Sequence, residues 1–177
     1  PHIAIYPDLR KHFDEVLYIG SVGGMEERMI KENIGVPYFS VTTTKFDRVH
    51  FFSNIKIPKL LICGIKDAKK ILEKEKPDVV FSKGGYVSLP VVVAARILKI
   101  PVVSHESDLS MGLANKVMKG SCKTICTTFE KTAKKIGKKG KFTGSPMRND
   151  MIKGKSESKK YLKIDSEKPV LLITGGS

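Results

Sequence analysis

Side chains that could do acid–base chemistry gather in one short segment, His105-Glu106-Ser107-Asp108. The segment before it, Pro101 to Ser104, is short, apolar and β-branched, which indicates a buried strand. A histidine and carboxylates at the end of a strand could act as general acid and base, or could hold an anion or a sugar. His105 and Glu106 are therefore the candidate catalytic residues. A structural role for His105 and a helix cap by Asp108 remain open as alternatives.

Metal binding is not expected in this segment. Neighbouring side chains on a strand point to opposite faces, so His105 and Glu106 would not easily hold one ion. The chain also lacks the ligand spacing that is typical of metal sites. We therefore predict no metal and no cofactor.

A glycine turn follows another apolar segment, Val79–Phe81, which we predict to be a buried strand. Gly84 and Gly85 let the backbone turn sharply and let a ligand approach main-chain N–H groups. Ser88 suits the start of a helix, where free N–H groups favour an anion. The carboxyl ends of parallel strands form the ligand-binding edge of open α/β sheets, so both polar segments are expected at one edge.

Strand and helix patterns alternate along the chain, which predicts an α/β fold with a Rossmann-like, doubly wound parallel sheet. We expect strands at Glu15–Gly20, Tyr38–Val41, Val79–Phe81, Pro101–Ser104, Ser121–Thr128 and Lys141–Thr143. Helices are expected at the N-terminus, at Met25–Asn33, within Phe46–Leu72, from Ser88, near Ser110 and within Lys131–Lys141.

The charge of the chain predicts an anionic partner. The 177 residues carry a formal net charge of +14, which attracts a membrane surface, a nucleic acid or a phosphorylated substrate. Aromatic residues are only 7%, Trp is absent and no nucleic-acid-binding motif is visible, so we expect no nucleic acid. The three cysteines lack metal-type spacing and indicate reduced thiols in a cytosolic protein. No apolar run reaches the ~18 residues of a membrane span.

The segment from Phe46 to Leu72 is the most amphipathic part of the chain. A loop and a helix packed on the sheet would explain much of it. Its apolar residues next to lysines also fit a peripheral membrane face on anionic lipid. The predicted membrane patch consists of Phe51, Phe52, Ile55, Ile62 and Ile65 with Lys59 and Lys66.

The C-terminal part changes in composition. We expect one domain over 1–148, a polar, lysine-rich linker over 149–168, and a new strand with a glycine turn over 169–177. That last pattern is typical of the opening of a second nucleotide-binding domain. Arg148, at the domain end, could hold a phosphate or carboxylate, or could form a surface ion pair.

Together these motifs resemble the MurG family of bacterial peptidoglycan glycosyltransferases. The similarity covers nearly the whole chain, and the sequence of residues His105–Asp108 is most similar to that of the low-GC Gram-positive members. It rests on the order and spacing of segments 76–80, 84–88, 100–106, 112–116, 144–148 and 173–177.

The resemblance implies a GT-B architecture and an inverting transfer of N-acetylglucosamine from UDP-GlcNAc to the C4 hydroxyl of MurNAc in lipid I, which gives lipid II. The partners it implies are UDP-GlcNAc, undecaprenyl-pyrophosphoryl-MurNAc-pentapeptide (lipid I) and anionic inner-leaflet lipids at the cytoplasmic face of the cell membrane. By position, the acceptor pyrophosphate would meet Gly84, Gly85, Tyr86 and Ser88, and UDP-GlcNAc would meet Arg148, Ser177 and Asn115. Glu106 and Asn115 would lie in the acceptor and catalytic cleft.

The resemblance also places a first strand and a glycine loop ending in a candidate basic histidine ahead of Pro1. We therefore expect no transfer by these 177 residues alone. In many family members an Asn that contacts the sugar nucleotide stands at the position of Asp108. This contact is therefore not carried over unaltered to Asp108. Two alternatives remain: a related GT-B transferase acting on another lipid, and a non-enzymatic basic module that binds membrane or nucleic acid.

Overall fold

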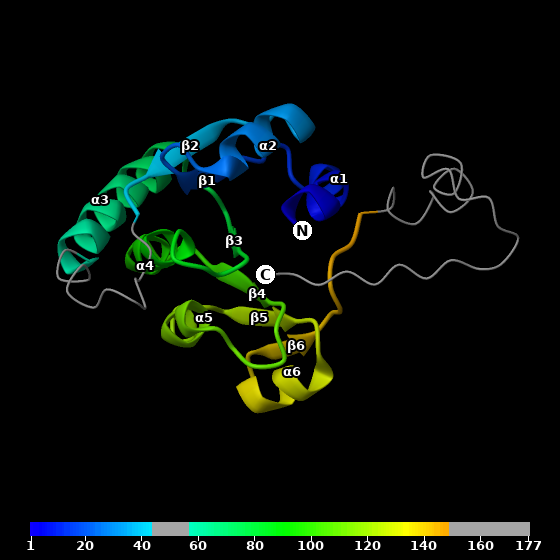
Figure 1. Ribbon diagram of the computed structural model, residues 1–177. Coiled ribbons are helices and arrows are strands. Elements are labelled where there is room, and N and C mark those ends of the chain that lie inside the picture. Colours follow the sequence, from blue (N-terminus) through cyan, green and yellow to red (C-terminus); the bar gives the residue numbers. More distant parts are fainter. Residues whose placement is uncertain (44–56, 149–177) are drawn as a thin grey trace, which may run out of the picture.

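The computed structural model describes residues 1–43 and 57–148. All its strands pair in parallel and alternate with helices along the chain (Figure 1), which confirms the predicted α/β class. One sheet has β1 (Tyr18–Ser21) beside β2 (Tyr38–Val41). The other has the order β3-β4-β5-β6, formed by Val80–Ser82, Val102–Glu106, Thr124–Thr127 and Gly140–Phe142.

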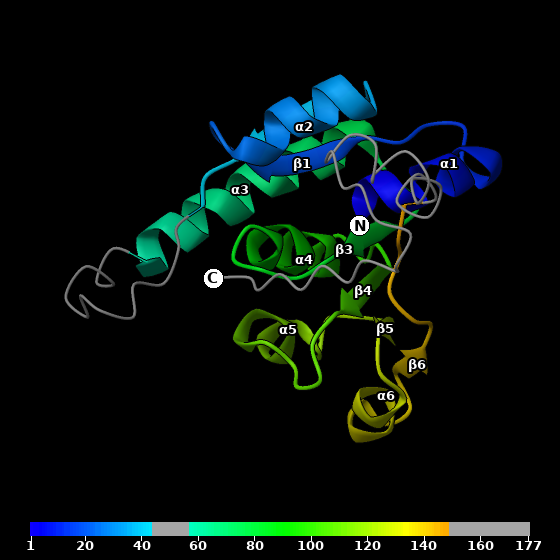
Figure 2. The same cartoon turned by 45° about the vertical axis from the view of Figure 1, so that its right-hand side comes forward.

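Six helices accompany the strands in the described ranges. They are α1 (His2–His12), α2 (Met25–Asn33), α3 (Ile57–Glu75), α4 (Ser88–Ile97), α5 (Leu113–Met118) and α6 (Glu130–Ile136). α3 packs along α4, and α4 contacts α5, so these helices form one layer (Figures 1 and 2). α2 packs on β1 and β2, and α6 packs on β5 and β6. None of the described helices combines the length and apolarity needed to cross a bilayer.

The main core lies between this helix layer and the four-stranded sheet. It contains Leu72 of α3, Val92 of α4, Val102 of β4 and Ile125 of β5, all at most 1% exposed. α4 is apolar on most of its surface because it lies between α3, α5 and the sheet. Burial of these side chains, at about 25 cal/mol per Å² of apolar surface, fixes β3 and β4 under the start of α4.

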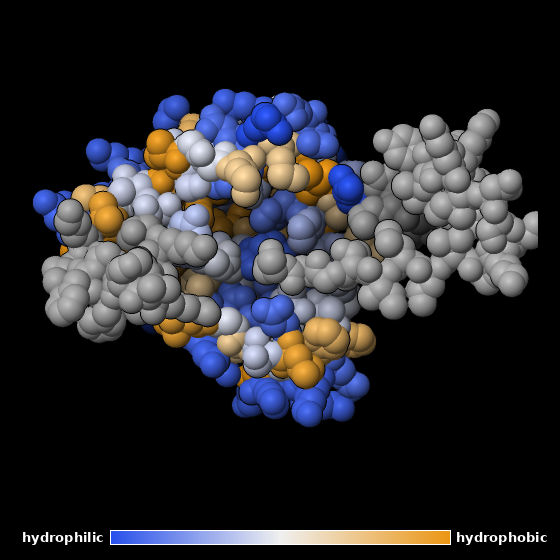
Figure 3. Space-filling view, in the orientation of Figure 1, coloured by the Kyte–Doolittle hydropathy of each residue, from blue (hydrophilic) through white to orange (hydrophobic). Residues whose placement is uncertain are grey.

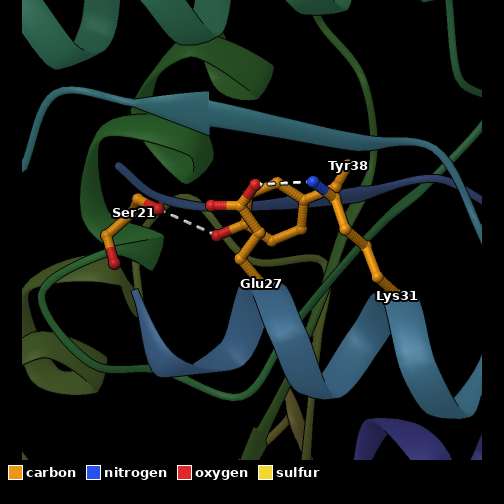
Figure 4. Close-up of polar contacts among 4 residues, drawn as sticks. All are labelled: Ser21, Glu27, Lys31 and Tyr38. Carbon is orange, nitrogen blue, oxygen red and sulfur yellow. Dashed lines mark hydrogen bonds and ion pairs between the residues drawn. The ribbon is translucent and has the colours of Figure 1, made fainter. Parts of the chain in front are cut away.

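The β1–β2 pair is joined by a tyrosine. The Tyr38 hydroxyl donates a hydrogen bond to the Ser21 carbonyl at 2.9 Å (Figure 4). The Tyr38 ring also lies over Gly20, where an added Cβ would sit 2.1 Å from the hydroxyl oxygen, so a side chain at Gly20 would displace the ring. On α2, Glu27 and Lys31 form an exposed ion pair (Figure 4), which contributes little to stability.

A cavity of about 880 Å³ lies between the two sheets and extends to the glycine turn after β3. Residues of β1 and β3 line it, and each of these strands has one edge without a strand partner in the described part of the chain. The space-filling view shows a hollow near the middle of the molecule, with both hydrophilic and hydrophobic residues inside it (Figure 3).

The predicted boundaries are confirmed at Met25–Asn33 and Tyr38–Val41, and the helix from Ser88 also begins as expected. Ending the following strand at Ser104 was wrong, because His105 and Glu106 pair with Cys126 and Thr127 and extend β4. A helix near Ser110 capped by Asp108 was also wrong. α5 begins at Leu113 with Gly112 as its N-cap residue.

Candidate functional site

The turn after β3 is held closed by two serines. The Gly84 amide donates to Ser82 Oγ at 3.1 Å, and Ser88 Oγ donates to the Gly84 carbonyl at 2.7 Å. Gly84 and Gly85 have φ values of 81° and 87°, in the region that side chains disfavour. The sequence therefore needs glycine here to bring the chain from β3 into α4.

Two amides of this turn are open. In the described part of the chain, neither Gly85 nor Tyr86 donates a backbone hydrogen bond. An added Cβ at Gly85 would meet nothing within 4 Å, and the Tyr86 side chain is 43% exposed. Both residues line the cavity. The turn thus presents free N–H groups to a cavity that can accept an anion.

Glu106 is buried, and its carboxylate organises the segment that follows β4. Oε1 accepts a hydrogen bond from the Asp108 amide at 3.0 Å, and Oε2 accepts from the Gly112 amide at 2.9 Å and from Asn115 Nδ2 at 2.8 Å. These hydrogen bonds outweigh the effect of burial and lower the pKa of Glu106. A carboxylate held in this way shapes the 108–112 loop.

Asn115 connects Glu106 to the glycine turn. It lies on α5, is 6% exposed, and accepts a hydrogen bond from Ser104 Oγ at 3.2 Å. Its side-chain oxygen lies 2.6 Å from where a Cβ on Gly84 would be. The two polar segments predicted to share one edge of the sheet are therefore in direct contact.

His105 is also buried, and both of its ring nitrogens have partners. Nε2 lies 2.9 Å from the Gly144 carbonyl, which can only accept, so Nε2 carries the proton. Nδ1 then accepts a hydrogen bond from Lys83 Nζ at 2.7 Å. Burial lowers the pKa of His105, and the charge of Lys83 acts in the same direction. These contacts fit the structural role for His105, and its catalytic role stays a prediction.

Lys83 is a site residue that sequence reasoning missed. It lies between β3 and Gly84, is half-buried and lines the cavity. Burial lowers its pKa, although the charges of Glu106 and Asp108 act in the opposite direction. The signal in the sequence was a lysine directly before Gly84-Gly85, but its contacts come from β4, far along the chain.

The remaining predicted residues are Arg148, the members of the predicted membrane patch and residues that lie outside the described ranges. Arg148 is exposed. Ile62 is 55% exposed, and Lys59 and Lys66 are exposed beside it. Ile65 instead packs partly buried against the core, and its place in the membrane patch stays a prediction. Phe51, Phe52, Ile55, Ser177 and the ranges 149–168 and 169–177 lie outside the described residues.

Metal ligands do not gather in the described ranges. Within 1–43 and 57–148, no three His, Cys, Asp or Glu side chains are grouped so as to hold an ion. The chemistry that the described site offers is hydrogen bonding from amides and an ammonium group, together with a shaped carboxylate–amide network.

A parallel α/β unit with an open glycine turn at the carboxyl ends of its strands belongs to the Rossmann-like class, whose ligands carry phosphate groups. The sequence matches the glycosyltransferase family 28 N-terminal domain over residues 1–127, and the chain belongs to that family.

Relatives agree with the resemblance seen in the sequence. The chain is 48% identical over 180 residues to a Clostridium perfringens protein named UDP-N-acetylglucosamine--N-acetylmuramyl-(pentapeptide) pyrophosphoryl-undecaprenol N-acetylglucosamine transferase, with all of this chain and 50% of that protein covered. It is 47% identical over 179 residues to the Clostridium botulinum protein of the same name, again with 50% of that protein covered. The chain thus spans about half the length of the curated relatives it matches.

Solved structures give the same fold. Acinetobacter baumannii MurG superposes with a TM-score of 0.63 at 25% identity, over 82% of this chain and 39% of that one. A UDP-N-acetylglucosamine 2-epimerase from Rickettsia bellii has a TM-score of 0.63 at 18% identity, over 93% of this chain and 47% of that one, which shows the shared fold only.

Proposed function

We propose that the chain is the acceptor-binding half of a peptidoglycan glycosyltransferase, which transfers GlcNAc from UDP-GlcNAc to the C4 hydroxyl of MurNAc in lipid I and yields lipid II. In this reaction the hydroxyl oxygen bonds to the anomeric carbon of GlcNAc and UDP leaves from the opposite face, so the configuration inverts. The hydroxyl proton passes to a base. Membership of glycosyltransferase family 28 and the names of the relatives support this choice of reaction.

The observation that carries the proposal is the open turn at Gly85 and Tyr86. Among the described residues its amides have no hydrogen-bond partner, both residues line a cavity of about 880 Å³, and the preceding Lys83 contacts His105. A diphosphate offers several acceptor oxygens to such amides and is further favoured by the start of α4. The lipid-borne diphosphate of the acceptor fits this turn, with Gly84 and Ser88 holding its shape.

The remaining roles follow from position. Glu106 and Asn115 fix the loop that borders the acceptor cleft, and His105 anchors the end of β4 to the Gly144 region. Arg148 and Ser177 are the proposed contacts to UDP-GlcNAc. Under this proposal, residues 169–177 open the domain that binds the nucleotide sugar.

The proposed location is the cytoplasmic face of the cell membrane, with the protein bound peripherally to anionic inner-leaflet lipids. The net charge of +14 and the exposed Ile62 between the exposed Lys59 and Lys66 support this location.

A hybrid enzyme tests the function. The chain replaces the aligned 180 residues of the Clostridium perfringens relative, whose remaining residues are kept. The hybrid is given UDP-GlcNAc and a lipid I analogue, and the product is measured by mass spectrometry against the parent enzyme. We expect a lipid II analogue from the hybrid and none from the 177 residues alone. A folded hybrid that leaves lipid I unchanged, or that glycosylates an added diacylglycerol instead, would contradict the proposal.

A further inference from the structure

The ammonium group of Lys83, directly before the glycine turn, is held by two side chains of the segment at the end of β4. It donates to His105 Nδ1 at 2.7 Å and to Ser107 Oγ at 2.5 Å. Both acceptors are neutral, because His105 carries its proton on Nε2, toward Gly144. The side chain is therefore fixed in place without losing its charge.

The charge of Lys83 has no carboxylate partner within ion-pair distance among the described residues. Some surface lysines are paired: Lys31 pairs with Glu27 and Lys134 pairs with Glu130, each at 2.8 Å. Lys83 differs from exposed lysines in being half-buried. A half-buried ammonium group has given up part of its hydration, so an anion that reaches it gains more than it would at an exposed lysine.

The cavity also provides suitable neighbours. Lys83, Gly85 and Tyr86 all line it, and the Gly85 and Tyr86 amides donate no hydrogen bond to any described residue. An ammonium group and adjacent backbone N–H donors together suit a diphosphate, because it carries charge on two groups and has several acceptor oxygens.

We propose that Lys83 binds the diphosphate of the acceptor lipid directly, and that His105 and Ser107 are positioning residues that hold its ammonium group at the glycine turn. This inference rests on the proposed function, since the acceptor supplies the diphosphate. UDP-GlcNAc carries a diphosphate as well, so the test must separate the two substrates.

The first experiment uses the hybrid enzyme with Lys83→Met. We expect the KM for the lipid I analogue to rise about 10- to 100-fold, as for the loss of a hydrogen-bonded charge, while the KM for UDP-GlcNAc stays within about twofold. Lys123→Met is the matched control. This exposed lysine lies directly before the amino end of β5, whereas the glycine turn lies at the carboxyl end of β3. An unchanged acceptor KM, or a rise in the UDP-GlcNAc KM alone, overturns the inference. A hybrid that is inactive with Lys83 in place contradicts the proposed function instead.

The positioning role has its own readout. His105→Gln should raise the acceptor KM less than Lys83→Met does, and should add nothing in the Lys83→Met background, because both changes act through one ammonium group. Additive effects of the two substitutions would overturn the positioning role.

A binding measurement covers the case in which Lys83→Met impairs the hybrid. Inorganic pyrophosphate is titrated into the 177-residue chain and followed by calorimetry and by the amide NMR signals of Gly85 and Tyr86. We expect binding that shifts both signals, weakens at least tenfold in Lys83→Met and is retained in Lys123→Met. Equal binding by all forms, or no shift of these signals, overturns the inference.

Discussion

The side chain of Asn115 occupies the space that a methyl group on Gly84 would need. Its Oδ1 and Nδ2 atoms lie 2.6 and 2.7 Å from the position of that Cβ. Asn115 is itself fixed, because Nδ2 donates to Glu106 and Oδ1 accepts from Ser104. The shape of the glycine turn is thus coupled to a buried polar network on β4 and α5.

This coupling predicts unequal effects of alanine at the two glycines. Both positions have positive φ, so each substitution should cost about 1–2 kcal/mol of backbone strain. Gly84→Ala must also displace the buried Asn115, whereas Gly85→Ala faces open space. We expect Gly84→Ala to lower the free energy of unfolding by at least about 1 kcal/mol more than Gly85→Ala, measured by urea denaturation.

Combining Gly84→Ala with Asn115→Ala provides the control. The double variant should lose less stability than the sum of the two single variants, because the displaced side chain is gone. Strict additivity would show that Asn115 is not the obstacle.

Glu106→Gln tests the role of the carboxylate. Three N–H groups donate to Glu106, and the NH₂ group of glutamine would face at least one of them. A buried donor left without an acceptor costs about 1–3 kcal/mol. We expect this loss of unfolding free energy and faster hydrogen exchange at the amides of Asp108 and Gly112.

Glu130→Gln is the matched control, since the exposed Glu130 only pairs with Lys134 on the surface. It should leave the unfolding free energy unchanged within the error of the urea titration. A Glu106→Gln variant that keeps full stability and slow exchange, but loses transfer activity in the hybrid, would favour a direct catalytic role over a positioning one.

The sequence predicted the boundaries of helices and strands correctly where glycine or proline residues mark them. α2 ends before Gly35 and Pro37, and β2 follows them, so both boundaries could be found from the sequence. β4 could not be bounded in this way. Its last residues are strand because β5 supplies the ladder partners of His105 and Glu106, and no local signal shows where a neighbouring strand lies.

In the candidate site, too, local backbone properties could be predicted from the sequence, whereas contacts between distant residues could not. Positive φ and free amides at Gly85 could be anticipated from the glycine pair, because they are backbone properties. The importance of Lys83 depends on His105, which lies 22 positions further along the chain. Likewise, Ile62 and Ile65 are equivalent in sequence, and only the packing of α3 on α4 buries one more than the other.

His105 predicts a loss of stability in mild acid. Burial lowers its pKa below the ordinary 6.5, so below pH 6.5 the unfolded chain binds a proton that the folded chain does not. The free energy of unfolding should therefore be largest above pH 6.5 and fall toward pH 5. Glu106, with its pKa lowered from 4.5, contributes a loss only below that window.

Replacing the histidine isolates its contribution. Between pH 6.5 and 5, His105→Gln should lose less stability than the native chain in urea titrations. Part of the dependence of the unfolding free energy on pH, here called the slope, should remain, because burial also lowers the pKa of His2 to about 4. The exposed His12 is the control position, and His12→Gln should leave the slope as it is in the native chain. A slope that His105→Gln does not alter would contradict the prediction.

α3 allows membrane attachment to be separated from folding. Ile62 is 55% exposed, whereas Ile65 packs partly buried against the core. Ile62→Ser should change the unfolding free energy by less than about 0.5 kcal/mol, yet weaken binding to phosphatidylglycerol vesicles about tenfold, because an apolar side chain no longer enters the lipid. Ile65→Ser should instead cost about 1–3 kcal/mol of stability. Sedimentation with vesicles and urea denaturation measure the two effects.

The lysines beside Ile62 should contribute through charge. Lys59→Gln and Lys66→Gln should each weaken vesicle binding by ~1 kcal/mol at low salt, and by less at high salt, because anionic lipid attracts basic residues near its surface. Val22→Ser is the control, since Val22 is 72% exposed and lies in the turn after β1, not on α3. If Val22→Ser weakens binding as much as Ile62→Ser does, the attachment is not specific to α3, because any exposed apolar side chain would then serve.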